Sequence, residues 1–253
     1  MTQGEAHRPR STAALVLLGV AALAVFLGLL ALGVWQVERR AWKLDLIARV
    51  DQRVAAAPVA PPGPADWPRV TADRDEYRHV RVSGRFLNDR EAQVVASTAK
   101  GAGYWVLTPL QAADGSVVLV NRGFVPAENR DPATRAAGQV EGPVTVTGLL
   151  RITEPKGGFL RSNAPAEERW YSRDVAAIAE ARGLTDVAPY FIDADAAPNR
   201  GGLPVGGLTV ISFPNSHLVY AVTWFGLAAL LAFGVGYAAR SERRVRRAQV
   251  EAG

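Results

Sequence analysis

Residues 214–226 of this chain read PNSHLVYAVTWFG, and they open the second of two long apolar segments. No charged residue occurs from Gly201 to Ala239, a run of 39 residues whose densely apolar part begins at Leu218. A helix of roughly 20 apolar residues is long enough to cross a bilayer. A basic cluster follows at once, so we expect a transmembrane helix over residues 214–239 and a basic cytoplasmic tail over residues 240–253.

The first apolar segment is free of charge from Ser11 to Val37, a run of 27 residues. A cleavable signal peptide is the alternative, because Ala31 and Gly33 could form a cleavage site, but the apolar core of such peptides usually has about 7–15 residues. The sequence therefore predicts a cytoplasmic tail over residues 1–11 and an uncleaved transmembrane helix over residues 12–37. No helix breaker follows Gly33, so this helix is expected to continue to about residue 54.

The basic residues next to the two spans indicate the orientation of the chain. Seven lie on the side of the termini: Arg8, Arg10, Arg240, Arg243, Arg244, Arg246 and Arg247. Five lie just past the first span, whereas none lies between Ser212 and Leu218. Both termini are therefore expected in the cytoplasm. The terminal arginines also account for the net charge of +5 without nucleic acid as a partner.

The part of the chain between the spans reads mainly as β-strands. Residues 55–75 are a proline-rich linker, and residues 76–213 are a β-rich domain. Alternating apolar residues and turn signals predict these strands: 79–86, 91–98, 104–111, 116–124, 143–153, 190–192 and 208–213. One helix is expected over residues 173–182, with Ser172 as its N-cap and Gly183 as its stop signal. The predicted fold class is membrane α+β, with two transmembrane helices flanking a small antiparallel barrel or bent sheet with one helix.

Few residues in the chain suggest catalysis or metal binding. The chain has three histidines and no cysteine, which excludes disulfides, thiolate catalysis and covalent c-type haem attachment. No nucleophile elbow, phosphate-binding glycine loop or zinc-protease motif is present, so we expect no enzyme activity. His79 is interpreted as structural. Asp193 and Asp195 lack an acid–base partner in the sequence, so a solvated turn is the better interpretation.

His217 is the most distinctive residue of the second span. At helical spacing it shares one stripe with Tyr220 and Trp224, which is also typical of an aromatic belt at the membrane interface. Asn215 is a natural N-cap, which places His217 in the first turn, where the helix dipole favours the neutral imidazole that an axial metal ligand needs. A haem group, with anionic propionates and an iron that accepts one histidine, is a ligand that would suit this position.

One face of the first helix carries a second cluster of large polar and aromatic residues. Five side chains share an arc of about 120° when successive residues are placed about 100° apart; they are Trp35, Gln36, Arg39, Trp42 and Lys43. An aromatic belt with basic residues at the lipid headgroups is one interpretation of this arc. A docking surface for the β-rich domain or for a partner is the other.

Three separate patches of the chain resemble the Surfeit locus protein one family of cytochrome c oxidase assembly factors. They are residues 32–43 (LGVWQVERRAWK), residues 120–126 (VNRGFVP) and residues 214–226, and Gly84-Arg85-Phe86 agrees as well. Two departures occur: Phe124 stands where many members have tryptophan, and Ser216 stands where many have asparagine. The patches extend from the first span to the second, so the resemblance covers nearly the whole chain.

The resemblance implies a bacterial inner-membrane protein with a periplasmic domain that binds or delivers non-covalent haem A. The implied partners are the catalytic subunit of a haem–copper oxidase, the haem A synthase and the lipid bilayer. His217 would be the axial ligand, with Tyr220, Trp224, Trp35, Arg39 and Lys43 around the haem. The remaining motif residues are assigned to structure or partner binding: Gln36, Trp42, Gly84, Arg122, Gly123 and Asn215. The alternative function is a cofactor-free scaffold that clamps an oxidase subunit through Arg122 and the barrel surface.

Overall fold

The structure, a computed structural model, describes residues 11–158 and 160–251. The chain forms two compact units: one contains most of the first long helix and all of the second, and the other, Arg49–Ile211, contains all the strands of the described chain. Most of the predicted N-terminal tail, residues 1–10, lies outside the described residues.

Two long helices, α1 (Thr12–Ala55) and α4 (His217–Glu251), are the main elements of the first unit. Both are long and apolar enough to cross a membrane. The prediction that the first helix continues past its apolar part to about residue 54 is confirmed. The second helix begins three residues later than predicted, at His217 rather than at residue 214, and it extends through the basic tail to Glu251.

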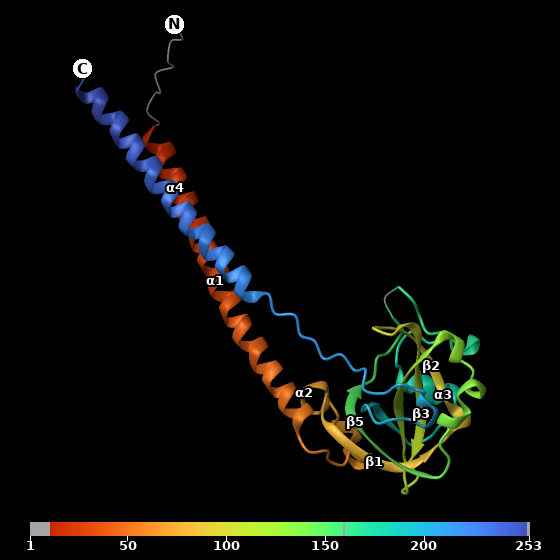
Figure 1. Cartoon of the computed structure of the whole chain (residues 1–253). Helices are drawn as coiled ribbons and strands as arrows, with labels where there is room; N and C mark the ends of the chain where they lie inside the picture. The colour runs from red at the N-terminus through yellow and green to blue at the C-terminus, as the bar shows by residue number, and fades with distance from the viewer. Residues whose placement is uncertain (1–10, 159, 252–253) are drawn as a thin grey trace. The chain divides into compact units, whose positions relative to one another are not determined.

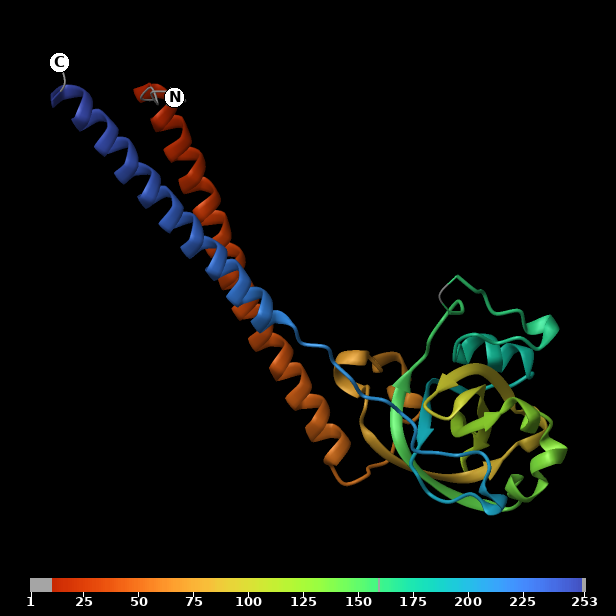
Figure 2. The same ribbon diagram turned by 45° about the horizontal axis from the view of Figure 1, so that its top comes forward.

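The second unit is built on a small closed barrel. Its strands are β1 (His79–Phe86), β2 (Ala92–Thr98), β3 (Gly101–Gln111), β4 (Val117–Pro126), β5 (Pro143–Ile152) and β6 (Val187–Ala194). They follow the order β1-β5-β6-β4-β3-β2, and a further pairing of β1 with β3 closes a ring of five strands with β2 outside it. Only the β4–β6 pairing is parallel among the described strands. The membrane α+β fold class is therefore correct, and the sheet is a barrel (Figures 1 and 2).

Two apolar clusters pack on opposite faces of the barrel wall. The inner cluster includes Val118, Val120 and Ile192, whereas the outer one includes Leu119 and Phe191 under the short helix α3 (Val175–Ala181). Neighbouring residues of β4 and β6 alternate between the two clusters because successive side chains of a strand point to opposite faces. Strand β4 is therefore buried on both faces, which explains its nearly continuous apolar sequence.

The linker before the barrel is docked on its surface and is not a free spacer. Val59 pairs with β1 through two backbone hydrogen bonds, from its own N–H to the His79 carbonyl (3.1 Å) and from the Arg81 N–H to its carbonyl (2.8 Å). The Tyr190 hydroxyl, which is buried in the barrel, donates to the Pro62 carbonyl at 2.7 Å. The short helix α2 (Ala72–Asp75) lies in the second half of this segment.

Two predictions about secondary structure are wrong. Residues 208–213 form no strand, because each of the five strands in the closed ring already has two neighbours, and the segment does not pair with the outer strand β2 either. The helix α3 is shorter than predicted and its cap is Asp174, whose carboxylate accepts a hydrogen bond from the Ala177 N–H at 3.2 Å. Ser172 instead is buried, and its hydroxyl accepts a hydrogen bond from the Gly157 N–H at 3.0 Å.

The prediction of a solvated turn at Asp193 is also wrong. Asp193 lies in β6 and is 3% exposed, where its carboxylate contacts Arg151 at 2.9 Å and Arg173 at 3.2 Å. Asn121 donates to the same carboxylate at 2.7 Å. Asp193 therefore holds β4, β5 and the segment before α3 together by polar contacts inside the domain. The sequence places these partners far apart, so their pairing could not be predicted from it.

Candidate functional site in the helix pair

Helices α1 and α4 pack along a seam with the spacing of an antiparallel coiled coil. The shielded side of α1 includes residues at alternating intervals of four and three: Ala22, Phe26, Leu29, Gly33, Gln36, Arg40 and Lys43. The same intervals on α4 connect His217, Ala221, Trp224, Ala228 and Leu231. This heptad spacing is what two helices need to stay in contact over several turns. The two helices run side by side in both overall views (Figures 1 and 2).

Small residues bring the two helices close together near the middle of the seam. Ala221 and Ala228 of α4 are each 2% exposed. A Cβ atom at Gly33 of α1 would lie 2.6 Å from the ring of Phe225, so only glycine permits this approach without movement of the ring. Small interface residues are typical of helices that associate within a bilayer.

His217 is the first residue of α4, and its side chain is bound to α1. Its Nδ1 atom lies 2.7 Å from Oε1 of Gln36, a side chain that is only 9% exposed. An amide oxygen accepts hydrogen bonds, so Nδ1 carries the proton and donates it. In the neutral ring of this tautomer, Nε2 carries the lone pair and is the atom that a histidine offers to a metal.

The helix start differs from the prediction in its cap. Because α4 begins at His217, the capping position falls on Ser216 and not on Asn215. The Asn215 Oδ1 atom is buried and has no hydrogen-bond partner in the described part of the chain. His217 nevertheless lies in the first turn, as the sequence predicts.

Of the predicted stripe on α4, the structure places two members on the seam and one outside it. Trp224 lies two turns after His217 on the same side, and its Nε1–H is buried without a hydrogen-bond partner among the described residues. Tyr220 is 53% exposed and does not belong to the seam. His217 and Trp224 are therefore brought together on the α1-facing side, whereas Tyr220 points away from it.

The five residues of the predicted arc on α1 also fall into two groups, one on the seam and one outside it. Gln36 binds His217, and the Lys43 ammonium lies 5.1 Å from the centre of the Phe213 ring, just before α4. Trp35 and Trp42 are 52% and 46% exposed, and the Arg39 guanidinium stacks on Trp42 at 3.9 Å. The structure brings Gln36 and Lys43 to the second helix and leaves the other three outside the seam.

Gln36 is the site residue whose contact the sequence reasoning missed. It was interpreted as a member of a polar face or structural motif, but not as the partner of His217. The signal was present in the alternating intervals of four and three, because a polar residue in a heptad seam must find a partner on the facing helix. The angular positions of the side chains around α1 alone do not identify the partner on α4.

The glycines of the two predicted barrel motifs have structural roles. Gly123 has a φ of +128°, and a Cβ there would lie 2.0 Å from the Val205 carbonyl oxygen, so glycine is required. Gly84 has a similar role, because a Cβ there would lie 2.3 Å from the Gln111 carbonyl where β1 meets β3 and closes the barrel. Arg122 is 3% exposed, so this residue cannot supply the surface contact that the scaffold alternative assigned to it.

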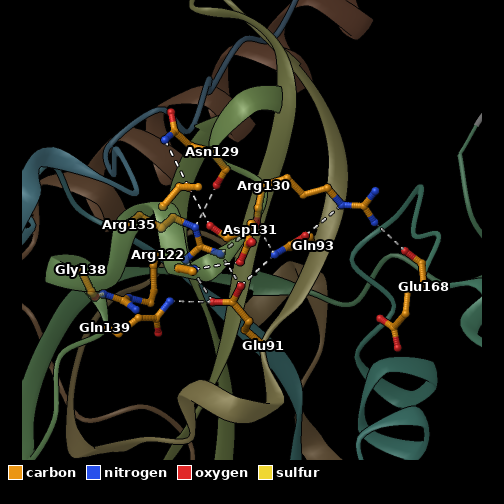
Figure 3. A network of polar contacts seen from close by, with 12 residues as sticks. Glu91, Gln93, Arg122, Asn129, Arg130, Asp131, Arg135, Gly138, Gln139 and Glu168 are labelled. Atoms are coloured by element: carbon orange, nitrogen blue, oxygen red, sulfur yellow. Dashed lines mark hydrogen bonds and ion pairs between the residues drawn. The ribbon is translucent and has the colours of Figure 1, made fainter.

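Arg122 belongs to a buried polar network that Figure 3 shows from close by. Arg135 makes two hydrogen bonds to the carboxylate of Glu91, one of them at 3.2 Å, and Gln139 approaches the same carboxylate at 3.4 Å. Arg122 donates to the Gly138 carbonyl. Burial lowers the pKa of Arg122 to about 10, since few favourable contacts replace the lost water.

No cluster of three or more metal-binding side chains is found in the described ranges, 11–158 and 160–251. Haem iron is the type of metal centre that a protein can hold with one histidine. The site that the structure offers is therefore His217, oriented by Gln36 and followed on the same seam by Trp224.

The comparisons with known proteins agree with one another. A model described as the SURF1 family matches residues 23–229, a range that includes both His217 and Gln36. Surfeit locus protein 1 of Homo sapiens is 39% identical over 219 residues, which cover 80% of this chain and 71% of the human protein. A SURF1-like protein of Monosiga brevicollis is 39% identical over 213 residues, with 79% and 78% covered. A SURF1-like protein of Drosophila melanogaster is 34% identical over 221 residues, with 80% and 71% covered.

Proposed function

Because the chain belongs to the SURF1 family, we propose that it is an assembly factor for a haem–copper cytochrome c oxidase. In this role it binds haem A, or delivers it, to the catalytic subunit of the oxidase at the membrane surface. The protein performs no turnover chemistry of its own, and its partners are that subunit and the haem A synthase. Two helices able to cross a membrane support a site at the bilayer.

The observation that carries the haem proposal is the hydrogen bond between His217 Nδ1 and Gln36 Oε1, at 2.7 Å. Histidines that bind metals usually donate their other ring N–H to an oxygen atom, which fixes the tautomer and the orientation of the ring. Gln36 supplies this oxygen, so the residues present fit an iron ligand at Nε2 of His217. Haem A, when bound, would supply the redox-active iron that the oxidase needs, while this chain would supply the ligand and exclude water.

Other residues near the seam would contribute to binding. The indole N–H of Trp224 is buried and unpaired within the described chain, so it can donate to a polar group of a ligand. Lys43 lies on the same side of α1 as Gln36, and with Arg39 it is assigned to the propionates because cations pair with carboxylates. Trp35 and Tyr220 are exposed, and their assignment to the haem rests on the resemblance alone.

We assign the protein to the inner membrane of a bacterium as a multi-pass protein. Both termini are in the cytoplasm, because α4 ends in five arginines and the positive-inside rule places such clusters there. The barrel domain then lies in the periplasm.

The test is the absorbance spectrum of the full-length protein purified from a host that makes haem A. We expect a haem chromophore in the unaltered protein and a loss of most of it in His217→Ala. His79→Ala is the matched control, because it removes a histidine from the barrel and should leave the spectrum unchanged. If His217→Ala retains as much haem with the same spectrum, the ligand assignment is wrong.

The scaffold function is the second candidate, and the exposed side of α1 favours it. Trp35 and Trp42 are about half exposed there, with Arg39 stacked on Trp42, and such aromatic and arginine residues are enriched in protein interfaces. Co-purification decides between the two functions. A His217→Ala protein that lacks haem but still captures the oxidase subunit and supports its assembly would favour the scaffold.

A further inference from the structure

We propose that the end of the barrel next to Arg122 is a binding site for a small monocarboxylate. The site is a cavity of about 180 Å³, lined by residues that include Phe86, Arg122, Val140, Val144, Val146 and Asn199. It lies in the second unit of the chain and shares no residue with the site at His217. The proposal therefore does not depend on haem binding.

The guanidinium of Arg122 is the first reason. Its side chain is buried, one nitrogen donates to the Gly138 carbonyl, and its Nη1 atom has no hydrogen-bond partner in the described chain. A buried charge without an opposite partner strongly destabilises a protein. A carboxylate is the group that offsets such a charge best, because two of its oxygens can face the planar guanidinium.

The carboxylates of the protein do not serve as this partner. Glu91 is the acidic residue of the network whose charge acts on Arg122, but its two oxygens are bound by Arg135 and approached by Gln139. No ion pair within 4.0 Å joins Arg122 to an acidic side chain among the described residues. Arg122 and Arg135 thus depend on the same carboxylate, and Arg122 has no ion pair of its own in the described part of the chain.

The walls of the cavity define the rest of the ligand. Most of the lining is apolar, and the Phe86 ring also stacks on the Arg122 guanidinium, with 4.6 Å from its carbon atom to the ring centre. Pockets for drug-sized ligands have about 300–1,000 Å³, so this smaller cavity suits a short acid with an apolar tail. Like other small-molecule sites, the cavity has apolar walls and one charged group that fixes the orientation of the ligand.

A second acidic group on the ligand is disfavoured by Asp195, which also lines the cavity. Its carboxylate is 3.0 Å from Nε2 of His79, so one hydrogen-bond partner is already present. A dicarboxylate would bring its second negative charge near Asp195, whereas a monocarboxylate would not. The proposal therefore specifies a ligand with a single negative charge.

The competing explanation is an internal contact. Oε1 of Gln139 is also buried without a partner in the described chain, and a shift of that amide could satisfy Arg122 Nη1. In that case the cavity would not discriminate a carboxylate from a neutral molecule of the same shape. Binding of a carboxylate and of a neutral molecule of the same shape to the purified protein distinguishes the two explanations.

The experiment uses the full-length protein in detergent at constant ionic strength, with butyrate, butyramide and succinate as probes. Binding is followed by ligand-observed NMR and by the shift of the thermal unfolding midpoint, which rises when a ligand binds the folded state. We expect saturable binding of butyrate and at least tenfold weaker binding of butyramide and of succinate. No saturation by butyrate, or equal binding of butyramide, would overturn the proposal.

Two variants locate the binding. Arg122→Gln should weaken butyrate binding at least tenfold, and it should keep the fold because it removes an uncompensated charge. Val140→Trp fills the cavity from a half-buried position and keeps Arg122, so it should also abolish binding. If Arg122→Gln does not fold, the Val140→Trp result and the comparison of butyrate with butyramide still decide. Unchanged binding in both variants would show that butyrate binds elsewhere.

Discussion

In the barrel, the Asp193 carboxylate contacts the guanidinium groups of both Arg151 and Arg173, whereas in the helix pair His217 has one uncharged partner, Gln36. The barrel contains many ionisable groups, and most of the buried ones bind one another. The helix pair has few polar side chains on its seam, and one of them, Trp224, has a buried Nε1–H without a partner among the described residues. Polar contacts therefore stabilise the fold in the barrel, whereas on the seam they form the proposed haem site.

Arg122 is the exception within the barrel. It is as buried as Arg135, yet Arg135 is bound to Glu91, whereas Arg122 contacts a backbone carbonyl and the Phe86 ring but no acidic side chain among the described residues. Arg122, like His217, therefore lies at a position where a ligand could supply a further contact to the side chain.

Gly123→Ala should destabilise the barrel more than any other single change considered. The backbone at this position has a φ of +128°, which is strained for any residue with a side chain, and the added Cβ would also clash with the Val205 carbonyl. Together these conflicts are expected to lower the free energy of unfolding by about 4 kcal/mol or more. Denaturant unfolding of the full-length protein, followed by far-ultraviolet circular dichroism, measures the change. Gly115→Ala is the control, because its φ is also positive but nothing lies within 4 Å of the added Cβ.

Glu91→Gln should lower the free energy of unfolding by about 3 kcal/mol, because it leaves the buried Arg135 without its charged partner. Arg135→Met should be less harmful, since the Glu91 carboxylate then remains as a counter-charge for Arg122. The same unfolding measurement compares the two variants. Equal effects on the free energy of unfolding would indicate that the charge of Glu91 does not stabilise the Arg122 guanidinium.

Gln36→Leu should weaken haem retention by roughly 10- to 100-fold without removing the ligand, as is usual for the loss of a hydrogen-bond partner behind a metal-bound histidine. Gln36→Glu keeps an oxygen acceptor and should retain haem. The measurement is haem occupancy together with the position of the absorbance bands. A Gln36→Leu protein that binds haem like the unaltered chain would show that the contact with His217 is only structural.

The smallest effect concerns His79, at the junction of the linker and the barrel. Burial lowers the pKa of His79, but hydrogen bonds to the Asp195 carboxylate and the Ala56 carbonyl raise it, and the net pKa lies above the ordinary 6.5. The charged form is therefore favoured by folding, and this stabilisation is complete below pH 6.5 and lost as the pH rises through the raised value.

Unfolding at pH 6 and at pH 8 should reveal this contribution as a difference below about 1 kcal/mol, since the pair is partly exposed to solvent. His79→Gln should remove that part of the pH dependence. His217 lies in the other unit, so His217→Gln serves as the control and should leave the pH dependence of barrel unfolding unchanged. A pH dependence that persists in His79→Gln would assign it to another group.

Local signals in the sequence predicted most of the secondary structure. All six strands and the length of α1 follow from apolar periodicity, from turn signals and from the missing helix breakers after Gly33, although β6 is longer than the predicted 190–192. The hairpin between β3 and β4 follows from Asp114-Gly115, where Gly115 has a φ of +87°. These signals are reliable because they depend on residues that are neighbours along the chain.

The errors occurred where a residue's role depends on distant partners. Asp193 reads as a turn residue because its partners Arg151 and Arg173 lie 42 and 20 positions away. Residues 208–213 read as a strand, but each strand of the closed ring already has two neighbours, and the segment does not pair with β2 either. At the candidate site, the choice between Gln36 and the other polar residues of α1 depends on how α1 faces α4.

The sequence by itself determined that two apolar helices flank a β-rich domain and that His217 begins the second helix region, because length, charge and periodicity are local properties. Tertiary structure decided that Gln36 and not Trp35 meets His217, and that Arg122 is buried. The reason is that Gln36 and His217 are 181 positions apart in the sequence, and only the packing of two small-residue seams sets their register. That register pairs Nδ1 of His217 with the Gln36 amide, which is the physical basis of the proposed site.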